Sequence, residues 1–193
     1  MLDPLLLRII SVGFALLFIP AAVHKLANRS QFSAIVQAYE ILPRGLIRPS
    51  AVFIPLLELS LGVAWLLSGM PILFISSIAV MSALLLGLYT VGITVNLYRG
   101  RSYIDCGCGF STTITTTGKG QNVQHLSYGL LLRNVMLIAV ALVAVIPPAT
   151  REFLFIDYFN LLTATIALVL IYGAFNQLLT NRNAINAWRK SHG

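Results

Sequence analysis

Hydrophobic residues form long, nearly unbroken stretches along this chain, and short polar segments separate them. Five such stretches stand out, namely Leu5–Leu26, Ala51–Leu67, Ile72–Tyr98, Ser127–Ile146 and Phe159–Leu179. Each is long enough for a membrane-spanning helix, which needs at least about 17 residues, and none shows the alternation of an outer-membrane β-barrel strand. The second and third are joined by a tight break at Ser68–Pro71. The pattern predicts an all-α, polytopic membrane helix bundle with about five transmembrane helices.

Composition supports this prediction and limits the number of domains. The 193 residues are 58% hydrophobic and only 10% charged, whereas about a quarter of the residues in a soluble domain are charged. The first stretch has no basic segment before it and no small-residue cleavage site after it, so we expect a permanent span rather than a signal peptide. The sequence contains no repeat and no low-complexity tract. We therefore expect one integral membrane domain over residues 1–193.

The distribution of basic residues predicts the orientation in the membrane. With five spans, ten basic residues fall on one side: Lys25, Arg29, Arg44, Arg48, Arg99, Arg101, Lys119, Arg182, Arg189 and Lys190. Only Arg8 and Arg151 fall on the other side. The positive-inside rule places the ten-residue side in the cytoplasm and the N-terminus outside. The net charge of +7 is then explained by membrane topology and attraction to anionic lipid, and no nucleic-acid partner is expected.

The two cysteines, Cys106 and Cys108, are the main candidates for chemistry. They lie in a polar segment on the predicted cytoplasmic side, separated only by Gly107. Two thiols this close can alternate between dithiol and disulfide or bind a soft metal ion. Bridging them requires a sharply bent backbone, which glycine permits, and a strained, exposed disulfide exchanges readily. Because the cytosol is reducing, a static structural disulfide is not expected there.

A second candidate site consists of polar residues within the apolar spans. Glu58 and Arg133 lie at matching depths, roughly 9–10 Å from the cysteine-bearing side by helix rise, so we expect them to form an ion pair or face a wet cavity. Further polar residues lie near that side, namely His24, Lys25, Asn96 and Asn134. Together they predict a pocket that opens toward the cysteines. A purely structural interpretation remains open, in which the ion pair sets helix register and His24 and Lys25 mark the membrane interface.

Several short motifs occur along the chain in an order that is more specific than any one of them. They are Ala22–Leu26, Tyr39–Pro43, Pro55–Gly62, Asn96–Arg101, Asp105–Cys108 and Leu132–Asn134. The series resembles the MauE family of methylamine utilisation proteins, which are related to DoxX-like membrane proteins. The resemblance covers about residues 5–147, and the span at about 159–179 lies outside it. The family usually has Phe-Gly after its Cys-x-Cys, whereas this chain has Gly109-Phe110, a departure that leaves both cysteines in place.

The resemblance implies a multi-pass protein of the bacterial inner membrane, with a four-helix DoxX-like core plus one further helix. It also implies a thiol–disulfide role in maturing the small (β) subunit of methylamine dehydrogenase, a periplasmic protein rich in disulfides. The implied partner is a thioredoxin-like protein of the MauD type. Cys106 and Cys108 would be the redox pair, with Glu58, Arg133 and Asn134 shaping the pocket. No metal and no cofactor beyond the cysteine pair are expected, and no residue points to a quinone.

Two other functions remain open at this point. A small transporter or channel could use a buried Glu58–Arg133 pair to relay protons or gate a substrate. A copper-handling protein could bind Cu(I) through Cys106 and Cys108, with thioether ligands from Met70, Met81 and Met136. The redox direction, the electron acceptor and the oligomeric state also remain open.

Overall fold

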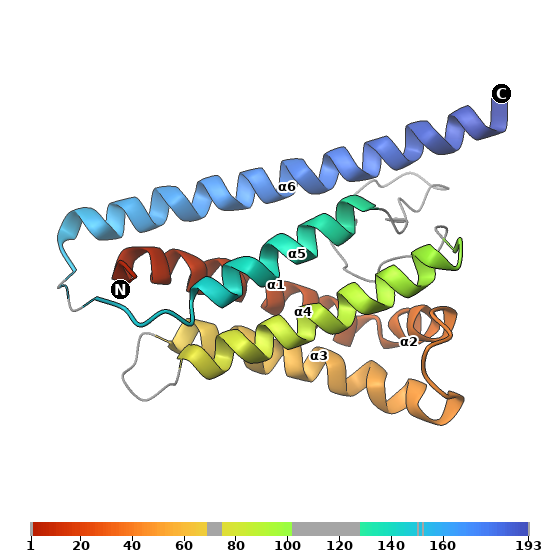
Figure 1. Ribbon diagram of the computed structural model, residues 1–193, viewed down its shortest axis with the longest axis horizontal. Coiled ribbons are helices and arrows are strands. Elements are labelled where there is room, and N and C mark those ends of the chain that lie inside the picture. The colour runs from red at the N-terminus through yellow and green to blue at the C-terminus, as the bar shows by residue number, and fades with distance from the viewer. Residues whose placement is uncertain (1, 69–74, 102–127, 150, 152, 193) are drawn as a thin grey trace.

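The computed structural model describes residues 2–68, 75–101, 128–149, 151 and 153–192. Over these ranges the chain forms six helices: α1 (Pro4–Ala27), α2 (Arg29–Ala38), α3 (Arg44–Leu67), α4 (Ile75–Tyr98), α5 (Tyr128–Val143) and α6 (Phe155–His192) (Figure 1). The described residues include no strand, and their only β contact is an isolated bridge between Leu2 and Pro148. The predicted all-α bundle is confirmed.

Helix lengths agree with the predicted spans, with differences at the boundaries. Four helices, α1, α3, α4 and α6, are long and apolar enough to cross a membrane. The fourth predicted span, Ser127–Ile146, corresponds to the shorter α5, whose 16 residues extend about 24 Å. The last helix continues to His192, beyond the predicted end at Leu179. Hydrophobicity marks only the lipid-exposed part of a helix, because polar residues outside the bilayer can continue the same backbone hydrogen bonding.

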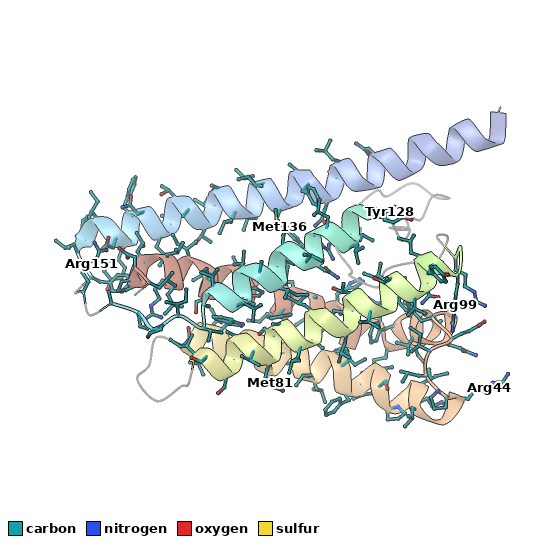
Figure 2. All side chains as sticks on the ribbon, in the orientation of Figure 1. Arg44, Met81, Arg99, Tyr128, Met136 and Arg151 are labelled. Atoms are coloured by element: carbon teal, nitrogen blue, oxygen red, sulfur yellow. The ribbon has the colours of Figure 1, made fainter. Side chains whose placement is uncertain are left out.

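Figure 1 shows α1, α3, α4 and α5 running side by side, with α6 along the outside of this group. The closest pairings are α1 with α3 and α4 with α5, and α6 contacts α1. Successive long helices alternate in direction. The end of α1, all of α2 and the start of α3 therefore lie at the same end of the bundle as the end of α4 and the start of α5. Arg44, Arg99 and Tyr128 lie at this end in Figure 2, and Arg151 lies at the other. We call it the basic end.

The core between α1, α3 and α4 combines aromatic stacking with buried hydrogen bonds. The ring of Phe14 stacks on Trp65 and on Phe18, with centroid distances of 5.1 Å and 5.8 Å. Ser11 donates to the backbone oxygen of Trp65, and the Trp65 indole donates to Ser82, both at 2.9 Å. Lipid surrounds the helices with apolar groups, so close packing and internal hydrogen bonds replace hydrophobic burial as the force that joins them.

A glycine sets the distance between α1 and α3, and this leads to a first prediction. A Cβ atom on Gly62 would lie 2.7 Å from Ile19 Cγ1 and 3.2 Å from the Ile19 backbone nitrogen. We expect Gly62→Val to lower the free energy of unfolding by about 1–3 kcal/mol, because the helices must move apart. Gly87→Val in α4 is the matched control, since nothing lies within 4 Å of its Cβ position. Unfolding by SDS in mixed micelles measures the free energy of unfolding of both variants. Equal losses of stability in Gly62→Val and Gly87→Val would contradict this packing role.

Hydrogen bonds and an ion pair at the end of the bundle opposite the basic end fix the start of α6. The Asp157 carboxylate caps the helix by accepting from the backbone N–H of Leu154 at 2.9 Å and from Arg151 at 2.9 Å. Arg151 also lies 3.6 Å from Asp3, which caps α1. The first turns of α1 and α6 are thereby joined through one arginine.

Candidate functional site

Three long helices contribute to a buried ion pair near the basic end. Lys25 is in the last turn of α1, and its Nζ lies 2.5 Å from Glu58 Oε1 in the middle of α3. Tyr89 of α4 donates its hydroxyl to the same oxygen at 2.6 Å and lies 3.2 Å from Lys25 Nζ. The Lys25 and Glu58 side chains are only 4% and 2% exposed. We call these three residues the charged triad.

The predicted pairing of Glu58 with Arg133 is wrong, because the carboxylate of Glu58 pairs with Lys25. Counting residues along the spans placed Lys25 at the membrane interface, but its long side chain turns inward from the helix end. Lys25 therefore does not act as an exposed charge of the basic end, and nine of the ten residues counted for orientation remain. The interpretation of Lys25 as an interface marker is also wrong.

Aromatic rings enclose the ammonium group of Lys25. Its Nζ lies 4.8 Å from the centroid of Tyr89 and 5.3 Å from that of Phe32 in α2. The electron-rich faces of aromatic rings stabilise a cation where water is scarce. Phe32 is itself buried, so the short helix α2 covers the ion pair at the basic end. The sequence pattern did not predict α2, because its ten residues are too few and too polar to span a membrane.

Arg133 lies close by and connects α5 to α6. Its Nη1 donates to Asn176 Oδ1 at 3.2 Å and to the Tyr172 hydroxyl at 3.4 Å. Its Nη2 donates to Asn134 Oδ1 at 3.4 Å. A guanidinium group carries five N–H donors and needs several acceptors when it is buried. Two of the acceptors, Tyr172 and Asn176, come from the outer helix, so α6 is part of the site.

The charged triad and Arg133 line one cavity of about 30 Å³. Its polar wall consists of Lys25, Glu58, Tyr89, Arg133, Asn134 and Tyr172, and its apolar wall of Leu17, Phe18, Ala21, Leu86 and Leu137. All five long helices contribute. The structure thus brings together four of the residues proposed from the sequence, namely Lys25, Glu58, Arg133 and Asn134.

Two other proposed pocket residues do not line this cavity. Asn96 is fully buried in α4, where its Nδ2 donates to the backbone oxygen of Gly92 at 3.0 Å. His24 is on α1 beside Asn28, with the Asn28 amide nitrogen 3.4 Å from its Nδ1. Cys106 and Cys108 lie outside the described residues. The described residues on either side of their segment, Arg101 and Tyr128, are both at the basic end.

A salt bridge holds the chain where it enters that segment. Arg101 Nη1 lies 2.6 Å from Glu40 Oε2, and Arg99 donates to the Glu40 backbone oxygen at 3.5 Å. Glu40 adopts a positive φ of 48°, which is unusual for a residue with a side chain. The turn after α2 is therefore bonded to the residues that directly follow α4.

Sequence reasoning missed Tyr89 and Tyr172 as site residues. The face of α4 that carries Tyr89 resembled ordinary helix packing, and Tyr172 lies beyond the region of family resemblance. The available signal was a phenol in the middle of an apolar span, because a buried Tyr hydroxyl usually has a hydrogen-bond partner.

The described residues offer little support for metal binding. They contain no group of three or more His, Cys, Asp or Glu side chains placed to hold an ion. Met81 on α4 and Met136 on α5 are 45% and 62% exposed, and neither lines the cavity. No Cys, Ser or Thr is among the described residues that line the cavity. Its ion pair, phenols and amides can order water, transfer protons and fix helix positions.

Comparison with known proteins identifies the family. The family described as methylamine utilisation protein MauE matches residues 3–147. A MauE protein of Paracoccus denitrificans is 31% identical over 142 residues, which cover 74% of this chain and 69% of that protein. One of Methylorubrum extorquens is 29% identical over 174 residues, covering 89% and 87%. One of Methylophilus methylotrophus is 37% identical over 106 residues, only about half of each chain (55% and 54%). No solved structure matches the chain.

The family match includes the charged triad, Arg133 and the segment that carries both cysteines. It ends before α6, which supplies Tyr172 and Asn176 to the same cavity. The match covers well over half of the 193 residues, and the chain belongs to the MauE family of methylamine utilisation proteins.

Proposed function

We propose that this protein is a thiol–disulfide protein of the bacterial inner membrane that assists maturation of the methylamine dehydrogenase small subunit. One observation carries the proposal. In a chain of the MauE family, the only two cysteines form a single Cys106-Gly107-Cys108 motif, in the segment that joins α4 to α5. A motif of this kind suits reversible exchange better than a permanent crosslink.

The proposed chemistry is exchange between two pairs of sulfur atoms. A thiolate of one protein attacks the disulfide of the other and forms a mixed disulfide, which a second thiolate then resolves. Two electrons and two protons pass from the dithiol to the disulfide, so the reaction balances without a further oxidant. The partner in this exchange is a thioredoxin-like protein of the MauD type, which passes the disulfide state on to the small subunit.

The buried site supports this function by holding the helix ends around the cysteine segment. The segment leaves α4 and enters α5, and these helices carry Tyr89 and Arg133. Tyr89 is bonded to Lys25 and Glu58 on one side of the cavity, and Arg133 is bonded to Tyr172 and Asn176 on the other. Because every long helix lines the cavity, a change there would move the attachment points of the cysteines.

The test is the redox state of Cys106 and Cys108 in cells. We expect acid-quenched cells to contain the pair as a mixture of disulfide and dithiol, and deletion of the thioredoxin-like partner to shift that ratio several-fold. Alkylation with a polymer-linked maleimide, with and without prior reduction, measures both forms on a gel. A pair that stays fully reduced whether or not the partner is present would overturn the proposal.

The same reagent in a membrane-impermeant form tests the orientation. The remaining basic residues place the cysteines on the cytoplasmic side, so intact spheroplasts should leave them unlabelled and permeabilised ones should label them. With that orientation, exchange with the periplasmic client passes through thiols of the partner. Labelling from outside would reverse the orientation and would allow direct contact with the client.

A further inference from the structure

Glu58 and Asn134 both line the cavity, and each has a buried polar atom without a hydrogen-bond partner among the described residues. Glu58 receives both of its bonds, from Lys25 and Tyr89, on Oε1, and its Oε2 has no partner. The amide nitrogen of Asn134 also has none. The two residues are only 2% and 1% exposed. A buried polar atom without a partner costs about 1–3 kcal/mol, so a bound molecule that satisfies both is strongly favoured.

The chemistry of the two atoms defines that molecule. Oε2 accepts a hydrogen bond and the Asn134 amide donates one, so the ligand must be both donor and acceptor. An anion would be repelled by Glu58, and a cation by Lys25 and Arg133. An apolar molecule would leave both atoms unsatisfied. A cavity of about 30 Å³ has room for one or two water molecules, since a single water needs roughly 10–15 Å³ measured this way.

We propose that this cavity is an internal water site through which Glu58 exchanges protons. The water in the cavity gives one of its protons to Oε2, which forms the O–H bond of the carboxylic acid, and accepts a proton from the surrounding water in the same step. No cation is held in the cavity, and the reverse step restores the carboxylate. The titratable and charged groups around Glu58 are Lys25 of α1, Tyr89 of α4, Arg133 of α5 and Tyr172 of α6. The water site does not depend on the thiol chemistry proposed above.

Hydroxyl-radical footprinting of the full chain in lipid nanodiscs tests for the water. Phe18 lines the cavity and is 1% exposed, whereas Phe14, one turn earlier, is 3% exposed and does not line it. X-ray radiolysis forms radicals from water molecules next to the labelled side chain. We expect Phe18 to be oxidised at least five-fold faster than Phe14, because two phenylalanines of equal burial then differ only in their access to water. Equal rates would overturn the proposal.

A cavity-filling substitution links the labelling to this site. Ala21→Val adds two methyl groups to the wall and removes no polar atom, so the Phe18 rate should fall to that of Phe14. Asn96→Leu is the control, because Asn96 is equally buried and has an unpartnered Oδ1 but lies outside the cavity. It should leave the Phe18 rate unchanged. If Ala21→Val does not fold, Asn134→Leu removes the donor and should have the same effect.

Infrared spectroscopy tests the proton transfer independently. On acid titration in nanodiscs, a protonated carboxyl band that is absent in Glu58→Gln should appear and should shift within the mixing time when H₂O is replaced by D₂O. Ala21→Val should slow that shift at least ten-fold. A shift of unchanged speed in Ala21→Val, or the lack of any band from Glu58, would refute proton exchange through the cavity. Neither outcome involves Cys106 or Cys108.

Discussion

Lys25→Met is expected to lower the free energy of unfolding by about 3–5 kcal/mol, because it leaves the Glu58 carboxylate charged and buried without its cation. The Glu58 side chain is only 2% exposed, so bulk water cannot supply the stabilisation that the ammonium group gave. Glu58→Gln should cost a similar amount, since it leaves the Lys25 charge without its carboxylate. Reversible unfolding by SDS in mixed micelles measures each loss.

The double variant identifies the true partner. Lys25→Met with Glu58→Gln removes both charges and lets a glutamine oxygen still accept from Tyr89. It should therefore be more stable than either single variant, with a coupling energy of about 1–3 kcal/mol in the double-mutant cycle. A parallel cycle of Glu58 with Arg133→Gln is the control and should show weaker coupling. Additive losses for Lys25 and Glu58 would contradict the ion pair.

Replacing Cys106 and Cys108 together with serine should reduce active methylamine dehydrogenase to background, the largest functional effect expected in this chain. No other cysteine is present to take over the exchange, and a serine hydroxyl cannot form a disulfide. The measurement is dye-linked methylamine oxidation in periplasmic extracts, together with immunoblots of the small subunit.

Ser111→Ala in the same segment is the matched control, because it changes a hydroxyl and keeps both thiols. The serine variant must also be present in the membrane at the normal level, so that lost activity reflects chemistry rather than degradation. Normal enzyme activity at normal abundance would exclude a redox role for the pair.

Hydrophobic patterning predicted the helices well and the partners of buried charges poorly. The apolar stretches identified α1 and α3 to α6 because lipid selects for long runs of apolar residues. Depth along a span placed Glu58 and Arg133 near one cavity, which the structure shows. Depth does not encode rotation about the helix axis or the reach of a side chain, and these two factors determine that Glu58 meets Lys25.

Two further features depended on tertiary contacts that no local pattern encodes. The short helix α2 is not apolar enough to be recognised as a span, yet its Phe32 covers the ammonium group of Lys25. Tyr172 lies on a helix that is mostly exposed along its apolar part, so its sequence surroundings are typical of lipid contact. Only the three-dimensional position of α6, which packs against α1, shows that its hydroxyl meets Arg133.

The bonds from Arg133 to Tyr172 and Asn176 also bear on how the chain assembles during synthesis. Translation proceeds from the N-terminus, so earlier helices reach the membrane first. Arg133 therefore reaches the bilayer before the helix that carries two of its hydrogen-bond acceptors. A nascent chain that ends after α5 holds a guanidinium group that lacks these two acceptors. Arrival of the last helix supplies both acceptors, so the burial of this guanidinium group depends on α6.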